Sequence, residues 1–363
     1  MSLINKLFNK KDEPVTSYDD FWTWFQKNEK KFFQAVNDGD HIERDFFEKL
    51  SPKLRELKDG FFYLTGMFDE NTAELVLTAD GAIKNIVFVE ELVSAAPTIF
   101  GWKFTALKPA LDIKDVRIEM GDFVFDSDTL FFYSNDHREY PDEIDITVVH
   151  RDFNEESRSA ITNGTYIFLD NFIGELNAAT TIDNLIVTGK NGAEKDLVPI
   201  EKLKNFLIWR EKEFVEKYDG IMHASTDAKF SVLEGKLEGG GRLVATINTD
   251  ILNWNNKASH PWLVTIEIPF QGSEDGGMPD DPTYDLLDQI ESSVVETLKE
   301  SDGYLNIGRQ TSGGVREIYF ACREFRRPSK VLHQLTLDYP DMQISFDIYK
   351  DKYWRSFNRF NVH

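Results

Sequence analysis

Two arginines near the tip of a predicted hairpin are the first candidates for chemistry. They lie in the stretch GYLNIGRQTSGGVREIYFAC, Gly303–Cys322, where two alternating apolar runs flank a turn of small residues. Period-two alternation places Arg309 and Arg316 on one side of the hairpin, beyond the cover of the predicted helices. Two guanidiniums beside Thr311 and free turn amides could hold a carboxylate or a phosphate. The alternative is that each arginine pairs with a surface acid such as Glu317 or Glu324, or caps the edge of the hairpin.

Three carboxylates form a second candidate site. By the same alternation, Glu267, Glu317 and Asp347 point away from the helices, on strands expected to lie side by side. Such a set could ligate a hard divalent cation, as in a metal-assisted hydrolase, or serve as an acid–base set. No histidine joins them and their neighbours are polar, which favours a solvated or partner-binding face.

Other catalytic patterns are absent from the sequence. It contains no nucleophile elbow, phosphate-binding loop or dinucleotide fingerprint, and its seven histidines are scattered. Cys322 is the only cysteine, which excludes an intrachain disulfide and fits a reducing compartment. Its place at the end of an apolar strand indicates a buried structural thiol. We therefore expect no cofactor and no metal, and a binding protein rather than an enzyme.

Composition narrows the range of partners. The formal net charge is −22, from 63 acidic and 41 basic residues, and a field of that sign repels phosphate backbones. General nucleic-acid binding is thus unlikely. No apolar stretch is long enough for a membrane span, and we expect a cytoplasmic protein. Met1–Lys11 carries a short amphipathic pattern, which suits a frayed leader or a weak membrane-surface anchor.

The pattern of elements predicts two α+β domains. The last third reads strand, amphipathic helix, two strands, helix, strand, in the β-α-β-β-α-β order of a ferredoxin-like fold. That fold is an antiparallel sheet with two helices on one face and the other face uncovered. Leu305 and Ile307 should then share the helix-covered face with Ile318 and Phe320. The expected division is a flexible leader at 1–18, an N-terminal α+β domain of unknown role at 19–220, and a ferredoxin-like domain at 221–363.

Four ordered motifs carry a resemblance in the C-terminal domain. They are PWLVTIEIP (Pro261–Pro269), GMP (Gly277–Pro279) before a helix containing Ile290-Glu291, GRQTSGGVREIYF (Gly308–Phe320) and DKYWRSF (Asp351–Phe357). Over roughly residues 222–360 the chain resembles the bacterial domain of unknown function 695 family, related in pattern to the regulator of ribonuclease activity B family. The resemblance implies a ferredoxin-like fold. By analogy with the ribonuclease regulators it implies action on a protein partner.

Two further features complete the sequence-based picture. In DKYWRSF, Trp354 is expected to close one end of the core and Asp351 to bond nearby backbone. The N-terminal part resembles uncharacterised bacterial sequences through a TADG turn, an AP…GWKFTAL stretch and IGEL at Ile173–Leu176. The preferred hypothesis is a non-catalytic binding or regulatory module that acts through protein–protein contacts. The alternatives are a metal-assisted hydrolase at the carboxylates, and anion or RNA-end binding at the arginine pair.

Overall fold

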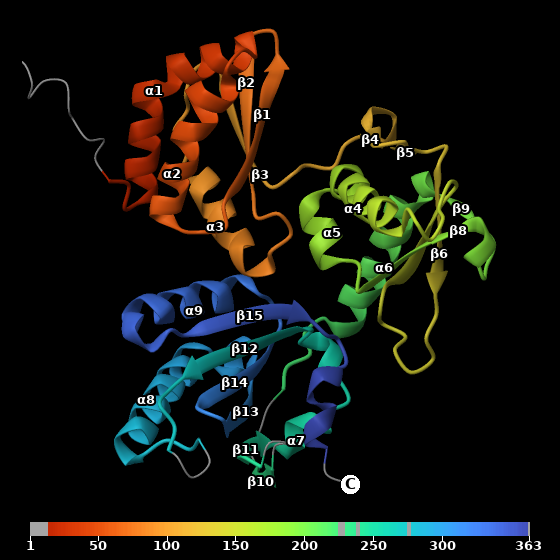
Figure 1. The fold of residues 1–363 in the computed structure, drawn as a ribbon. Helices are drawn as coiled ribbons and strands as arrows, with labels where there is room; N and C mark the ends of the chain where they lie inside the picture. Colours follow the sequence, from red (N-terminus) through yellow and green to blue (C-terminus); the bar gives the residue numbers. More distant parts are fainter. Residues whose placement is uncertain (1–13, 224–228, 237–239, 274–276, 362–363) are drawn as a thin grey trace, which may run out of the picture. The chain divides into compact units, whose positions relative to one another are not determined.

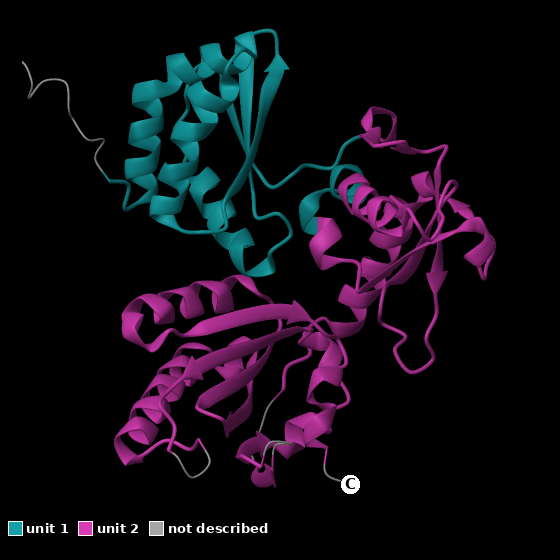
Figure 2. Cartoon of the chain, viewed as in Figure 1, with its two compact units in different colours: residues 1–111, 169–176 teal, residues 112–168, 177–363 magenta. Residues whose placement is uncertain are grey.

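The chain folds into mixed helix and sheet (Figure 1). The computed structural model describes residues 14–223, 229–236, 240–273 and 277–361. It separates into two compact units, residues 1–111 with 169–176 and residues 112–168 with 177–363 (Figure 2). The domain boundary after residue 220 stays a prediction, and residues 1–13 of the expected leader lie outside the described residues. None of the described helices is both long and apolar enough to cross a membrane.

The first unit is a three-stranded sheet with an aromatic core. Strand β1 is antiparallel to β2, and β2 is parallel to β3, with helix α3 between them in the chain. Ser17 caps the start of α1, and Gly39 ends it in the left-handed region. The Phe25 ring lies edge-on to Trp102 and Phe104, with centroids 5.0 and 5.3 Å apart. The elements are α1 (Tyr18–Asp38), η1 (Glu43–Phe47), α2 (Glu48–Leu57), β1 (Phe62–Asp69), β2 (Thr72–Thr78), α3 (Ile83–Ser94) and β3 (Trp102–Ala106).

The second unit begins with a four-stranded sheet in the order β8-β7-β6-β9. All six residues of the central strand β7 are buried, as expected for a strand covered on both faces. Residues 169–176, at the end of helix α4 and the start of helix α5, belong to the first unit. The elements are η2 (Ile113–Asp115), β4 (Ile118–Met120), β5 (Phe123–Phe125), β6 (Leu130–Asn135), β7 (Asp145–His150), α4 (Arg158–Ile173), α5 (Glu175–Thr180), β8 (Asn184–Gly189), η3 (Lys190–Gly192), β9 (Val198–Pro199), η4 (Ile200–Lys202) and α6 (Leu203–Tyr218).

A six-stranded antiparallel sheet follows in the same unit, in the order β10-β11-β13-β14-β12-β15. Strand β12 pairs with both β14 and β15, so the three strands expected to lie side by side do so. Helices α8 and α9 lie on one face (Figure 1). The elements are β10 (Phe230–Lys236), β11 (Arg242–Asn248), α7 (Thr249–Leu252), η5 (Lys257–Ser259), β12 (Trp262–Pro269), α8 (Asp281–Thr297), η6 (Glu300–Asp302), β13 (Tyr304–Ser312), β14 (Val315–Cys322), α9 (Arg326–Asp338), η7 (Pro340–Met342), β15 (Ser345–Lys350) and η8 (Arg355–Phe360).

The face opposite α8 and α9 is not uncovered, which corrects the sequence-based expectation. Helix α7 and the terminal turn η8 pack on part of it and form a second core. This core contains Leu305 and Ile307 together with Tyr319 and Ala321. The expectation that Leu305 and Ile307 share a face with Ile318 and Phe320 is therefore wrong. The remaining buried members are Ala245, Ile247, Ile251, Leu252, Leu263, Trp354, Phe357 and Phe360.

A β-bulge in β13 is the reason for the exchange of faces. The β13–β14 register shifts between Asn306 and Gly308, so one strand carries an extra residue. Before the bulge Leu305 lies opposite Ala321, whereas after it Arg309 lies opposite Ile318. Gly308 has φ +132°, and a Cβ there would lie 2.2 Å from the Thr246 carbonyl oxygen on β11. The bulge therefore depends on glycine at this position.

We expect Gly308→Ala to lower the free energy of unfolding by about 2–5 kcal/mol, because strain at positive φ adds to a backbone clash. Urea unfolding of the full chain measures the loss. Gly235→Ala is the matched control in the same sheet, since its new Cβ would meet only the Leu243 side chain at 3.8 Å. Equal effects of the two changes would contradict the assigned role of Gly308.

Candidate functional site

The predicted arginine pair lies beneath helix α8. Arg309, Thr311 and Arg316 share one face of the β13–β14 hairpin, as alternation predicted, but α8 covers that face. Arg309 Nη1 donates to Glu291 Oε2 at 2.8 Å. Arg316 is 1% exposed; its Nη1 is 3.4 Å from Asp288 Oδ1, and its Nε donates to Thr311 Oγ1 at 3.3 Å. The arginines therefore pair with acids of α8.

Burial makes this pairing necessary. It raises the pKa of Glu291 and lowers the pKa of Arg316, since both charged forms lose water. The Tyr284 ring lies 4.9 Å from the Arg316 guanidinium and adds a cation–π contact. Two cations and two nearby carboxylates balance each other, so these charges hold α8 against the hairpin.

The three predicted carboxylates lie on adjacent strands. Glu267 is directly opposite Glu317 in the β12–β14 register, and Asp347 is opposite Thr265 in the β12–β15 register. Glu267 and Asp347 are exposed and Glu317 is half-buried. We call Glu267, Glu317 and Asp347 the carboxylate strip. It lies on the face that α7 and η8 cover only in part.

The contacts of the carboxylate strip are with neutral groups. Glu317 Oε2 accepts hydrogen bonds from Gln310 Nε2 and the Tyr319 hydroxyl, both at 2.9 Å. Glu267 Oε2 accepts one from Ser345 Oγ at 3.4 Å. No ion pair between described residues includes a carboxylate of the strip. Nor do three or more acidic, histidine or cysteine side chains anywhere in the described part of the chain form a group suited to a metal ion.

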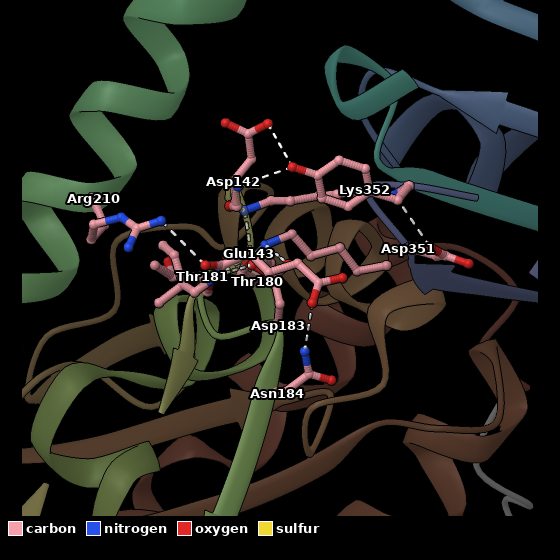
Figure 3. A network of polar contacts seen from close by, with 12 residues as sticks. Asp142, Glu143, Thr180, Thr181, Asp183, Asn184, Arg210, Asp351 and Lys352 are labelled. Atoms are coloured by element: carbon pink, nitrogen blue, oxygen red, sulfur yellow. Dashed lines mark hydrogen bonds and ion pairs between the residues drawn. The ribbon is translucent and has the colours of Figure 1, made fainter. Parts of the chain in front are cut away.

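A second polar cluster surrounds the terminal motif DKYWRSF (Figure 3). Lys352 is fully buried, and its Nζ donates to the Asp142 carbonyl at 2.6 Å and to Asp183 Oδ2 at 2.8 Å. Lys350 Nζ lies 2.9 Å from Asp183 Oδ1 and donates to the Thr180 carbonyl at 2.6 Å. The Asp183 carboxylate thus pairs with two ammonium groups, one from the last residue of β15 and one from two residues further along the chain.

The rest of the motif binds the loop between β6 and β7. The Tyr353 hydroxyl donates to Asp142 Oδ2 at 2.8 Å and accepts from the Asp142 amide at 3.0 Å. Arg355 Nη2 donates to Glu143 Oε1 at 2.7 Å, and its guanidinium lies 4.7 Å from the Tyr140 ring centroid. Three side chains of the motif therefore recognise three nearly consecutive loop residues. We call these contacts and those of Asp183 the terminal junction.

Burial also governs the pKa values in the terminal junction. It lowers the pKa of Lys352 to about 8. It raises the pKa of Glu143, against the opposing charge of Arg355. The pKa of Asp142 falls, because hydrogen bonds from Lys217, Tyr218 and Tyr353 outweigh its burial. The Lys352 amine is enclosed, so its lowered pKa does not make it available to a substrate.

Asp142 also lines a pocket of about 500 Å³. Phe214 provides an apolar wall, with the Lys352 ammonium 4.2 Å from its ring centroid. Arg210 donates to the Pro141 and Glu143 carbonyls. The ionic side chains at this pocket are already used for contacts within the protein. The other lining residues are Pro141, Glu213, Glu216 and Lys217.

Sequence reasoning found the terminal motif but missed its main role. Trp354 is 1% exposed and donates its indole N–H to the His260 carbonyl, as expected for a core residue. Asp351 accepts hydrogen bonds from the amides of Tyr353 and Ser356, also as expected. The signal for the terminal junction was the alternation of Lys350 and Lys352 followed by an arginine. Their partners lie about 170–210 residues earlier, and no local pattern indicates them.

In the first unit, three sequence segments meet at one buried carboxylate. Glu175, from IGEL, accepts hydrogen bonds from Thr78 Oγ1 and the Gly81 amide of TADG. It also accepts one at 3.0 Å from the amide of Lys108, which follows GWKFTAL. Lys108 Nζ in turn pairs with Asp80 at 3.1 Å. These donors satisfy the carboxylate, which indicates a structural role.

Comparison with known families agrees with the C-terminal motifs. Residues 239–360 match the model of a family of unknown function, DUF695. The match extends from β11 to η8 and includes the arginine pair, the carboxylate strip and the terminal motif. No curated protein and no solved structure matches the chain.

Arg355→Gln should lower the free energy of unfolding by about 1–3 kcal/mol, because it removes the counter-charge of Glu143, a nearly buried carboxylate. Adding Glu143→Gln should recover most of the loss, since no buried charge then remains unpaired. Urea unfolding of both single variants and the double variant tests this. Losses that simply add would show that the two side chains do not interact.

His260 should make the protein sensitive to acid. It is fully buried, Nδ1 bonds to Ser259 Oγ, and Nε2 has no partner among the described residues. Burial lowers the pKa of His260 to about 3, whereas an unfolded histidine titrates near 6.5. Between these values the unfolded chain binds the additional proton. The stability due to neutral His260 is therefore complete above pH about 6.5 and declines as the pH falls towards 3.

Urea unfolding at several pH values between about 4 and 7 measures this effect. The free energy of unfolding should fall less steeply with acidification in His260→Gln than in the natural chain. His41→Asn is the control, because His41 is exposed and has a positive φ that asparagine tolerates. If His260→Gln and His41→Asn gave the same pH dependence as the natural chain, His260 would not be the titrating group.

Proposed function

We propose that residues 221–363 form a ferredoxin-like, non-catalytic binding module that acts through protein–protein contacts in the cytoplasm. We propose further that its partner contacts the carboxylate strip with a basic segment. The N-terminal part would be a separate α+β domain whose role is not assigned. In the ribonuclease regulators the same kind of fold acts by binding a protein partner, and this analogy supports the class of function and no more.

The observation that carries the proposal is the direct opposition of Glu267 and Glu317. Like charges in opposite positions of an antiparallel pair destabilise a sheet. Adjacent strands are about 4.8 Å apart, well within the screening length of physiological salt, so the repulsion is felt. The direct donors to the pair, from Gln310, Tyr319 and Ser345, are neutral. The Arg359 guanidinium bonds to the Tyr319 hydroxyl and, among the described residues, not to a carboxylate of the strip. Cationic side chains of a partner would offset the repulsion between the two carboxylates.

The geometry favours a basic protein segment over a metal ion. Asp347 lies opposite Thr265, one alternation away from the Glu267–Glu317 pair, so the three carboxylates form a row along the sheet. A row of carboxylates can bind basic side chains that are spaced along a segment of a partner protein. The guanidinium of an arginine can donate two hydrogen bonds to one carboxylate. The formal charge of −22 also favours association with cationic partners.

Neutralising the strip should abolish partner capture. The full chain and the variant Glu267→Gln/Glu317→Gln/Asp347→Asn are compared as baits for proteins from a cell extract. Proteins that depend on the strip should carry basic segments, disappear with the variant, and be retained less as ionic strength rises. The matched control Asp285→Asn/Glu296→Gln/Asp341→Asn removes three exposed acids of the same domain and should retain them.

A stability measurement accompanies the binding experiment. Glu267→Gln alone should raise the free energy of unfolding by a few tenths of a kcal/mol, up to about 1, because it removes the repulsion from Glu317. A gain in stability with a loss of binding is the expected signature of a functional charge. Identical captured proteins for the strip variant and the control variant would refute the proposal.

A further inference from the structure

Strand β1 of the first unit has a free edge. Within the described residues it pairs with β2 alone, and the sheet order β1-β2-β3 ends there (Figure 1). A terminal strand presents a row of amide and carbonyl groups to any chain that can pair with it. The side chains of β1 indicate which kind of strand could pair with this edge.

One face of β1 is apolar and exposed. Phe62, Leu64 and Phe68 are 49%, 50% and 56% exposed. The Lys103 ammonium lies 3.7 Å from the Phe68 ring centroid, and Lys103 is opposite Glu74, which is opposite Gly66. The β1–β2 register shifts between Met67 and Asp69, so Phe68 is the extra residue of a bulge. Its contact with Lys103 places Phe68 on the same face as Gly66 and Leu64, and the three large side chains form one row.

The edge also lacks the charges that usually prevent pairing. Sheet proteins commonly place lysines or acids on terminal strands to stop association. The two outer strands of the C-terminal sheet follow this practice, with Glu234 and Lys236 on β10 and Asp347 and Lys350 on β15. By contrast, the residues of β1 before Asp69 read FYLTGMF and carry no charge. Residues 62–68 therefore present no charge that would oppose pairing.

We propose that β1 pairs antiparallel with β1 of a second copy of this chain, about a two-fold axis at Thr65. This interface goes beyond the function proposed for the C-terminal module. With the axis at Thr65, Phe62 lies opposite Phe68 of the second copy, and Leu64 lies opposite its Gly66. A Cβ added at Gly66 would meet nothing within 4 Å, so there is open space for the facing leucine. The row is thus complementary to itself, as a two-fold interface requires.

Pairing of the two edges would join the sheets of the two copies into one six-stranded sheet. The apolar row of one copy would then lie beside that of the other, so Phe62, Leu64 and Phe68 would bury part of their exposed surface in cross-strand contacts. Backbone hydrogen bonds between the two β1 strands would satisfy the amide and carbonyl groups at the free edge.

The test is the oligomeric state of the full chain, measured by sedimentation velocity and light scattering from about 1 to about 100 µM. We expect a dimer that strengthens with added salt, because two copies of charge −22 repel each other and salt screens this repulsion. Leu64→Lys should raise the dimer dissociation constant about tenfold or more. Val232→Lys is the control, since it places the same charge on an apolar residue, 63% exposed, of the outer strand β10.

Hydrogen exchange gives a readout that needs no variant. Amides of residues 62–68 should exchange more slowly at about 100 µM than at about 1 µM, whereas those of β10 should not change. A chain that stays monomeric at high concentration and high salt would overturn the proposal and leave the edge to another partner. A dimer that Val232→Lys disrupts and Leu64→Lys does not would also overturn it, by placing the interface on β10.

Discussion

The β-bulge of β13 determines how both faces of the C-terminal sheet are used. One extra residue reverses the alternation of side chains within a single strand. Leu305 and Ile307, before the bulge, pack beneath the terminal turn, while Arg309 and Thr311, after it, face helix α8. The same strand thus serves an apolar core and a polar contact. This arrangement requires glycine at position 308, where the backbone has a positive φ and approaches β11 closely.

The buried charged groups discussed above have ion-pair or hydrogen-bond partners within the protein. Arg316 and Glu291 meet beneath α8, Lys352 meets Asp183, and hydrogen-bond donors surround Glu175. These groups would cost several kcal/mol if left without partners, so each marks a place where the fold depends on a distant contact. Against this background the carboxylate strip stands out. Its charges lie at the surface, oppose each other across two strands and contact only neutral donors, which is why we assign them to a partner.

Much of the C-terminal architecture follows from local patterns. Apolar residues at period two and period 3.6 predict the order of strands and helices, and the known geometry of that order places β12 between β14 and β15. The opposition of Glu267 and Glu317 depends on that register and on alternation in strands without a bulge, so it too could be predicted. Alternation also placed Arg309 and Arg316 together correctly. It could not show how far α8 extends over the hairpin, and so it named the wrong acids as their partners.

The sequence by itself determined the order of strands and helices in the C-terminal domain, the two neighbours of β12, the acidic charge and the likeness of the C-terminal motifs to DUF695, because these depend on residue types and short spacings. Only the tertiary structure decided which face Leu305 and Ile307 occupy and what the cations of the terminal motif bind. A bulge adds one residue without a change in composition, and the partners of Lys352 and Arg355 lie about 170–210 residues away. Contacts at that separation arise from chain folding, and no local periodicity records them.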